Sequence, residues 1–220
     1  HSFHRIIFLI AVLVTLLLPS CASQPSRQMT ALIAMGNAEI LPGGETEWQA
    51  LNHKTIIHTG DSIRTGDDTW VYLEIDDGSL VGLTPNTKAT LVTFSESAKN
   101  PVTLFDLADG LVYVRVTKAL GKGSFKIHTP VFTGSVVGSQ MSVIYIQSSN
   151  VAGVTCFEGN VDAEISYDAE AGMTACHLIS GVKLSPSSPD EWTVKKCEHP
   201  VVVNREETQA YSDWEKMYID

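Results

Sequence analysis

Histidines are the first residues to consider, because an imidazole can bind a metal ion or move a proton near neutral pH. Those beyond the N-terminal apolar segment are His53, His58, His128, His177 and His199. No two of them stand in an H-x-x-x-H or H-E-x-x-H frame, the spacing that places two zinc ligands on one helix face. The spacing therefore predicts surface or turn histidines and no metal site.

The motifs of nucleophilic and phosphate chemistry are also missing. Residues 134–139 read Gly-Ser-Val-Val-Gly-Ser, which is not the G-x-S-x-G of a serine nucleophile. Residues 121–124 read Gly-Lys-Gly-Ser, without the upstream glycine and the Gly-Lys-Ser/Thr order of a phosphate loop. The acidic pairs at 67–68 and 76–77 match no calcium loop. We therefore predict a protein that is not an enzyme and that needs no cofactor.

Cys21 is the residue for which the sequence most clearly predicts a covalent modification. A positive start at His4 and Arg5 is followed by an apolar run from Ile6 to Leu18. This run of about 13 residues is too short to span a bilayer core of ~30 Å and has the length of a secretory signal. It ends in Leu-Pro-Ser-Cys at 18–21, which resembles a bacterial lipobox, although Pro19 departs from its usual residues.

The lipobox resemblance implies that Cys21 takes a thioether-linked diacylglycerol, that residues 1–20 are removed, and that the new amino group is acylated. Ala22, rather than Asp, follows the cysteine. This resembles the default of transfer to the outer membrane in Gram-negative lipoproteins, where Asp would imply retention in the inner membrane. The acyl chains would hold the protein on the membrane, and residues 21–30 would form a lipidated tether. Two alternatives stay open: an ordinary signal peptide followed by an accidental cysteine, or an uncleaved anchor.

The remaining cysteines are Cys156, Cys176 and Cys197. Export to an oxidising compartment favours disulfides over thiolate metal sites, and no C-x-x-C frame is present. Cys156 lies in an apolar strand and is expected to be a buried small hydrophobe. Cys176 and Cys197 bracket a Pro- and Ser-rich stretch, so they are the candidate disulfide pair.

The amino-acid composition limits which fold classes and which classes of partner are compatible with the rest of the chain. Of its 220 residues, 44% are hydrophobic and 18% charged, which is enough apolar material for a packed core. The formal net charge is −10, from 15 basic and 25 acidic residues. Because nucleic-acid binders carry basic surfaces, we exclude that class of partner.

Short apolar or alternating runs separated by turn residues follow one another from Ala31 onward. Runs such as Trp70–Ile75 and Leu111–Val116 are rich in β-branched and aromatic residues. Asp-Gly pairs at 77–78 and 109–110 predict tight turns. The spacing predicts an all-β domain of short strands, as a sandwich, a barrel or a β-helix-like stack.

The C-terminal segment has a different period. Asn204 is a candidate N-cap for a helix over about 205–218, with acidic residues in its first turn. Tyr211, Trp214 and Tyr218 would share one face of that helix. This aromatic face is expected either to dock on the β body or to bind a partner.

Several motifs, in the same order as in a known family, resemble the FecR domain. They are G-D-S-I-R-T-G at 60–66, D-D-G-S at 76–79 with L-T-P-N-T at 83–87, G-L-V-Y-V at 110–114, F-K-I-H-T-P at 125–130, V-V-G-S at 136–139, and the strand pair over 154–161. Departures are Ser139 for Thr and Met141 where Phe is usual. The glycines and aspartates of these motifs are predicted to have structural roles, since Gly fits turns and Asp accepts hydrogen bonds from nearby backbone N–H groups.

The FecR resemblance implies an all-β domain over residues 31–182, with a C-terminal extension over 183–220. Known FecR regulators sense an outer-membrane siderophore transporter outside the cytoplasm and control a sigma factor inside. Here a signal peptide and lipobox stand where those proteins have a cytoplasmic segment and a spanning helix. We therefore expect a lipid-anchored envelope protein that binds or scaffolds an envelope protein or glycan. The alternative is a signalling accessory that relays the state of a transporter to a separate regulator or sigma factor.

Overall fold

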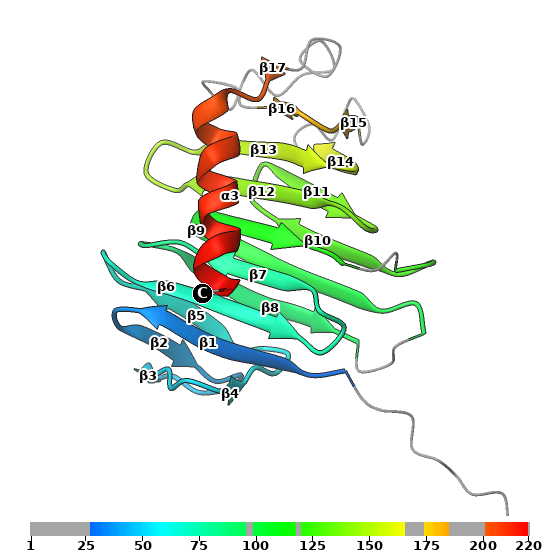
Figure 1. Cartoon of the computed structure of the whole chain (residues 1–220). Helices are drawn as coiled ribbons and strands as arrows, with labels where there is room; N and C mark the ends of the chain where they lie inside the picture. The colour runs from blue at the N-terminus through cyan, green and yellow to red at the C-terminus, as the bar shows by residue number, and fades with distance from the viewer. Residues whose placement is uncertain (1–26, 96–98, 118–119, 166–173, 185–200, 220) are drawn as a thin grey trace, which may run out of the picture.

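The computed structural model describes residues 27–95, 99–117, 120–165, 174–184 and 201–219. Within these ranges the strands form one large mixed sheet of 17 strands, with a single C-terminal helix. The sheet folds over into two parts that face each other, here called sheet A and sheet B (Figure 1). The prediction of an all-β domain with a C-terminal helix is confirmed.

Sheet A, in spatial order, contains β4 (Thr55–Ile56), β1 (Met29–Met35), β6 (Trp70–Ile75), β7 (Leu80–Leu83), β9 (Val102–Arg115), β12 (Gln140–Ile146), β13 (Val151–Glu158), β16 (Val182–Leu184) and β17 (Val201–Val202). Sheet B contains β3 (Gln49–Ala50), β2 (Ala38–Leu41), β5 (Ser62–Thr65), β8 (Lys88–Phe94), β9, β10 (Ser124–His128), β11 (Phe132–Val136), β14 (Asn160–Ile165) and β15 (Thr174–Ile179). Among these pairings, β9 with β10 is parallel and the others are antiparallel.

Strand β9 joins the two sheets, which corrects one sequence prediction. The first half of β9 pairs with β8 and β10 in sheet B, and the second half pairs with β7 and β12 in sheet A. Asp109-Gly110 was predicted to be a tight turn between two strands, but the strand continues through it. Gly110 has φ +101, a backbone conformation that lets the strand bend without a Cβ clash.

The core lies between the two sheets and is built by alternation of buried and outward residues. In β10, for example, Phe125 and Ile127 are buried, while Ser124, Lys126 and His128 face outward. Met141, the residue that departs from the usual Phe, is fully buried in this core. Burial of apolar area at this period-2 pattern fixes which face of each strand points inward.

Helix α3 (Arg205–Ile219) follows β17 and lies across sheet A (Figure 1). Asn204 Oδ1 accepts a hydrogen bond from Glu207 N–H at 2.9 Å, and Glu207 Oε2 accepts one from Asn204 N–H at 3.2 Å. This reciprocal capping box explains why the helix begins here, as the sequence predicted. Within the described ranges, no helix is long and apolar enough to cross a membrane.

Candidate functional site

The outer face of sheet A carries a continuous row of side chains beneath α3. The strand registers place these residues side by side in the order Leu32, Tyr72, Gly82, Tyr113, Ser142, Thr155 and Lys183. The helix runs along this row. Glu207 binds Lys183 at one end, with Oε1 2.6 Å from Nζ, and Glu215 lies 3.4 Å from Arg115 nearer the other end.

The aromatic face of α3 is buried against that row. Tyr211 is 4% exposed and packs on Phe157 and Tyr113, with ring centroids 4.3 and 5.7 Å away. Trp214 is fully buried, and its ring centroid lies 5.2 Å from that of Tyr113. A side chain at Gly82 would overlap the Trp214 indole, so the absence of a Cβ there makes room for it.

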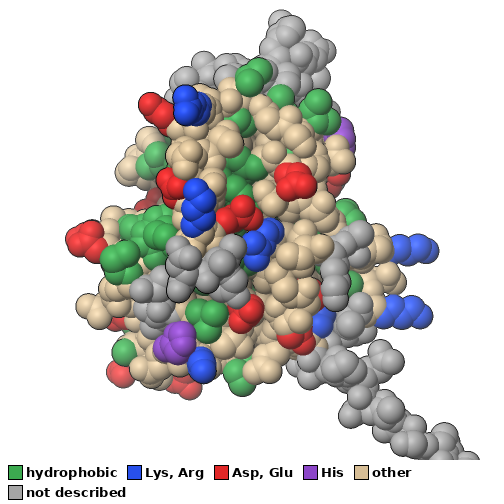
Figure 2. All heavy atoms as spheres, viewed as in Figure 1, with side chains coloured by type: hydrophobic (Ala, Val, Ile, Leu, Met, Phe, Trp, Pro, Cys, Tyr) green, Lys and Arg blue, Asp and Glu red, His purple; other side chains and the backbone are tan. Residues whose placement is uncertain are grey.

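Of the two interpretations of the aromatic face, the docked helix is the one seen in the structure. Tyr211 and Trp214, which were candidate partner-binding residues, therefore present no free surface here. The side chain of Tyr218 lies outside the described part. On the side that carries the helix, acidic, basic and hydrophobic side chains are interspersed (Figure 2).

The polar residues of the FecR-like motifs hold the backbone. Asp61 is 5% exposed, and its two carboxylate oxygens accept hydrogen bonds from Gly43 N–H and His58 N–H at 2.9 and 2.8 Å. Thr65 Oγ1 donates to Thr84 O and accepts from Thr87 N–H. These groups satisfy buried backbone partners, so the motifs build a scaffold.

The outer face of sheet B is different, because no described helix or strand lies over it. Its outward positions are mostly polar and partly or fully exposed. One row runs through Ser62, Thr90, Asp106, His128, Thr133 and Glu164. The next row contains Leu104, Lys126, Ser135, Asp162 and His177. We call this surface the open face, and it is the candidate interaction site.

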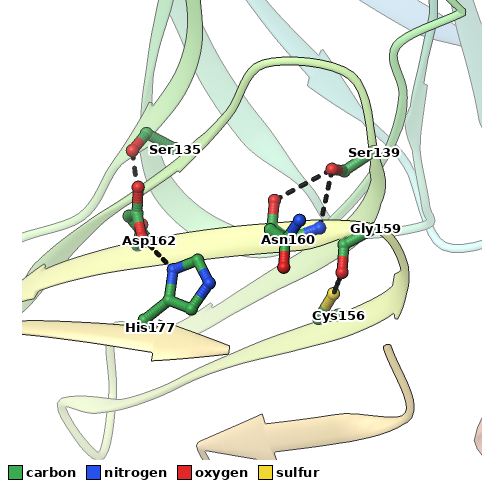
Figure 3. A network of polar contacts seen from close by, with 7 residues as sticks. All are labelled: Ser135, Ser139, Cys156, Gly159, Asn160, Asp162 and His177. Carbon is green, nitrogen blue, oxygen red and sulfur yellow. Dashed lines mark hydrogen bonds and ion pairs between the residues drawn. The ribbon is translucent and has the colours of Figure 1, made fainter. Parts of the chain in front are cut away.

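Part of the open face carries a serine, an aspartate and a histidine in contact (Figure 3). Asp162 Oδ1 lies 2.6 Å from His177 Nδ1, while Ser135 Oγ donates to the main-chain oxygen of Asp162 at 3.4 Å. Asp162 thus stands between the other two residues. Since the serine bonds the backbone of Asp162 and not the imidazole, the arrangement does not activate a nucleophile.

The neighbouring contacts in Figure 3 fasten the turn between β13 and β14. Ser139 Oγ donates to Asn160 O and accepts from Asn160 N–H, both at 2.9 Å. Cys156 Sγ lies 3.5 Å from Gly159 O. Ser139, which departs from the usual Thr, therefore provides the hydroxyl group that this turn uses.

The two cysteines in the described part of the chain are in different states. Cys156 is a free, fully buried thiol, and burial raises its pKa to about 11. Cys176 is disulfide-bonded and 2% exposed. Its predicted partner, Cys197, lies outside the described residues, so the pairing stays a prediction. Cys21, the predicted lipid attachment site, lies outside them too.

A hollow of about 420 Å³ lies where the described chain begins, lined by residues that include Arg27, Ile56, His58 and Phe94. The Arg27 guanidinium stacks on Phe94 at 4.7 Å and forms an ion pair with Asp77 at 3.2 Å. Its charge is therefore already neutralised. Among the described residues, no group of three or more His, Cys, Asp or Glu side chains is placed to hold a metal ion.

Residues 61–162 match the family described as FecR protein. The chain carries a FecR domain. The match spans the strands from β5 into β14, and so includes the whole bend of β9 and most of the open face. The motifs that resembled this family from 60 to 161 lie almost entirely within it. No curated protein matches the chain.

Two crystal structures share the fold of a large part of this chain. Both are of a candidate anti-sigma factor from Parabacteroides distasonis ATCC 8503, with a TM-score of 0.54 and 14% sequence identity. The similarity covers 69% of this chain, and 64% and 63% of the two crystallised chains. The chain therefore spans less than two thirds of those proteins' length.

Sequence reasoning missed the open face, although a signal for it was present. Outward residues such as Arg64, Lys126 and Asp162 alternate with buried ones along the predicted strands. That pattern shows which side chains leave the core, but not which of the two outward faces the helix covers. Which outward face is covered depends on where α3 packs, and the packing partners of α3 come from strands that are far apart in the sequence.

Proposed function

We propose that this chain is a non-catalytic signalling protein whose FecR domain binds a partner protein and relays that event to a regulator or sigma factor. The observation that carries the proposal is the FecR match over residues 61–162. The fold shared with a candidate anti-sigma factor supports a sigma-factor pathway as its context. Of the two functions predicted from sequence, these findings favour the signalling role over pure scaffolding.

The open face of sheet B is the surface that we assign to the partner. It is broad and polar, and within the described residues only sheet A has a helix docked on its outer face. Partner interfaces of proteins that also exist alone are about as polar as the remaining surface, so a polar face suits a regulated contact. The motif residues inside the domain then serve to hold this face rigid.

Loss of the protein tests this function. If it relays a signal, deleting its gene should change the transcript levels of a set of genes read by one sigma factor, as measured by RNA sequencing. Expression of the full chain in the deleted strain should restore those levels. An unchanged transcript profile under conditions in which the protein is made would contradict the signalling role.

We further propose that the protein acts in the cell envelope, anchored to the outer membrane through lipid on Cys21. The lipobox-like sequence at 18–21 and Ala22 support this placement. Several acyl chains would make the anchor stable, since each buried CH₂ contributes about 0.8 kcal/mol.

Intact mass of the protein extracted from native membranes tests the anchor. We expect a form that begins at Cys21 and carries acyl-chain mass, and we expect Cys21→Ala to abolish that form. Cys156→Ala is the matched control, because it removes a thiol without touching the anchor. An unlipidated product from the unaltered chain would leave a secreted or periplasmic protein without a lipid anchor.

A further inference from the structure

Two cations face each other across β5 and β8 on the open face. The register places Arg64 directly opposite Lys88, and both side chains are exposed. Like charges at directly opposite positions destabilise a sheet. The chain has only 15 basic residues against 25 acidic ones, so its composition does not force such a pair. A local arrangement that costs stability is a reason to look for a function.

Trp48 and Glu39 hold this pair in place. The Trp48 ring, which precedes β3, lies over both cations, with its centroid 4.3 Å from Arg64 Cζ and 5.7 Å from Lys88 Nζ. Glu39 Oε2 lies 2.6 Å from Arg64 Nε. That hydrogen bond lowers the pKa of Glu39 and raises that of Arg64, so both stay charged at neutral pH. We call Trp48, Arg64 and Lys88 the tryptophan–cation platform.

The platform keeps donors available for a ligand. Only Nε of Arg64 is used by Glu39, and among the described residues no ion pair or hydrogen bond involves Lys88 Nζ. Asp109 lies opposite Lys88 on the other side, but its Oδ1 accepts a hydrogen bond from Gln147 N–H at 3.0 Å. The two terminal guanidinium nitrogens and the ammonium group therefore remain as charged donors on an exposed surface.

The chemistry of these donors suits carboxylates. A guanidinium group binds carboxylates with paired hydrogen bonds, and an ammonium group adds a second charged donor one strand away. Ser62 and Thr90 lie next to the platform, with their hydroxyl oxygens 2.7 Å apart, and can bond an extended backbone. The Trp48 ring adds an apolar surface against which a peptide can pack.

We propose that the tryptophan–cation platform binds an acidic segment of the partner protein. A single exposed ion pair contributes only about 0–1 kcal/mol. A flat platform of this kind therefore needs several carboxylates on one chain, whose contacts add through effective concentration. This inference rests on the proposed function, because it names the recognition chemistry on the partner's side.

A fluorescent peptide of alternating Glu and Ser, measured by anisotropy against the purified full chain at low salt, tests the platform. The double variant Arg64→Gln/Lys88→Gln should weaken binding about tenfold, since it removes two exposed charge contacts. The matched control Lys54→Gln/Lys122→Gln removes the same charge from two exposed turns outside the open face and should leave binding unchanged. Binding should also fall as salt rises.

The Trp48 indole N–H resonance gives a second readout. It should shift with the peptide in the unaltered chain and in the control, but not in the platform variant. An unshifted Trp214 resonance in all variants would show that each one is folded.

Three results would overturn the inference. The first is an equal loss of peptide binding in the control variant. The second is displacement of the peptide by inorganic phosphate at the same anion concentration, which would indicate a site for small anions. The third is platform-dependent binding to vesicles of anionic lipid with no binding of the peptide. If the peptide fails while the transcript changes described above occur, only the platform is refuted and the signalling role stands.

Discussion

At the scale of single residues, the aspartates and threonines of the FecR-like motifs form hydrogen bonds with the backbone. The sequence predicted that Asp61 and Asp77 would bond nearby backbone N–H groups, and both do so. It did not predict the link between Thr65 and Thr87, because those residues are brought together only when β5 and the turn before β8 meet. Local bonds can be read from neighbouring residue types, whereas long-range ones depend on the fold.

Gly82 is a residue whose importance no local pattern shows. It lies in β7 with an ordinary strand backbone, yet it stands directly beneath Trp214. We predict that Gly82→Ala displaces α3, because the new Cβ would overlap the indole. The expected cost is about 1–3 kcal/mol, as for other overpacked sites. Chemical denaturation followed by tryptophan fluorescence measures it.

Gly134→Ala is the matched control for this prediction. Gly134 also lies in a strand, but the nearest atoms to an added Cβ would be 3.4 Å away, an ordinary contact. The control should therefore cost much less than Gly82→Ala. Equal effects of the two substitutions would mean that the cost comes from strand glycines in general and not from the contact with Trp214.

At the scale of elements, the helix could be predicted and the long strand could not. The interval 205–218 and the N-cap at Asn204 agree closely with α3, because caps and 3.6-residue periodicity are local signals. The two runs that become β9 looked like separate strands around an Asp-Gly turn. Gly110 is compatible with either a turn or a bend. Because β8 and β7 pair with β9 on the two sides of this residue, the strand bends and continues.

The contact between α3 and sheet A should weaken at high pH. Burial raises the pKa of Tyr72 to about 12, and it also raises those of Tyr113 and Tyr211, all of which lie in this contact. Unfolded tyrosines titrate near pH 10. The folded state therefore holds these protons more tightly, so their contribution is fully present below pH 10 and is lost as pH rises through the raised values.

Circular dichroism measured between about pH 8 and about pH 12 checks this prediction. We expect the near-ultraviolet aromatic signal to fall above about pH 10, before the far-ultraviolet β signal does, because the inter-sheet core is a separate cluster of side chains. Tyr72→Phe should move the aromatic transition to higher pH by removing one ionisable group. Simultaneous loss of both signals would contradict a separately docked helix.

At the scale of the whole molecule, α3 covers the outer face of sheet A, whereas no described helix or strand covers the outer face of sheet B. The sequence resemblance to the FecR family over 31–182 is confirmed over residues 61–162. Its motifs predicted a scaffold, since they consist of turn glycines and backbone-bonding side chains, and Asp61 and Thr65 do bond the backbone. The sequence resemblance could not predict which outer face is left without a docked helix, because that depends on where α3 docks.

The proposed role of the open face in signalling can be tested in the cell. Its most direct test is complementation of the gene deletion with a variant of that face, Thr90→Arg/Ser135→Arg. The matched control is Ala210→Arg/Met217→Arg, which adds the same charge to exposed positions of α3. Transcripts of the affected genes and the amount of protein in the envelope are measured together. We predict that the control restores the transcripts and that the open-face variant, present in equal amount, does not. Full restoration by the open-face variant would show that the open face does not carry the signal.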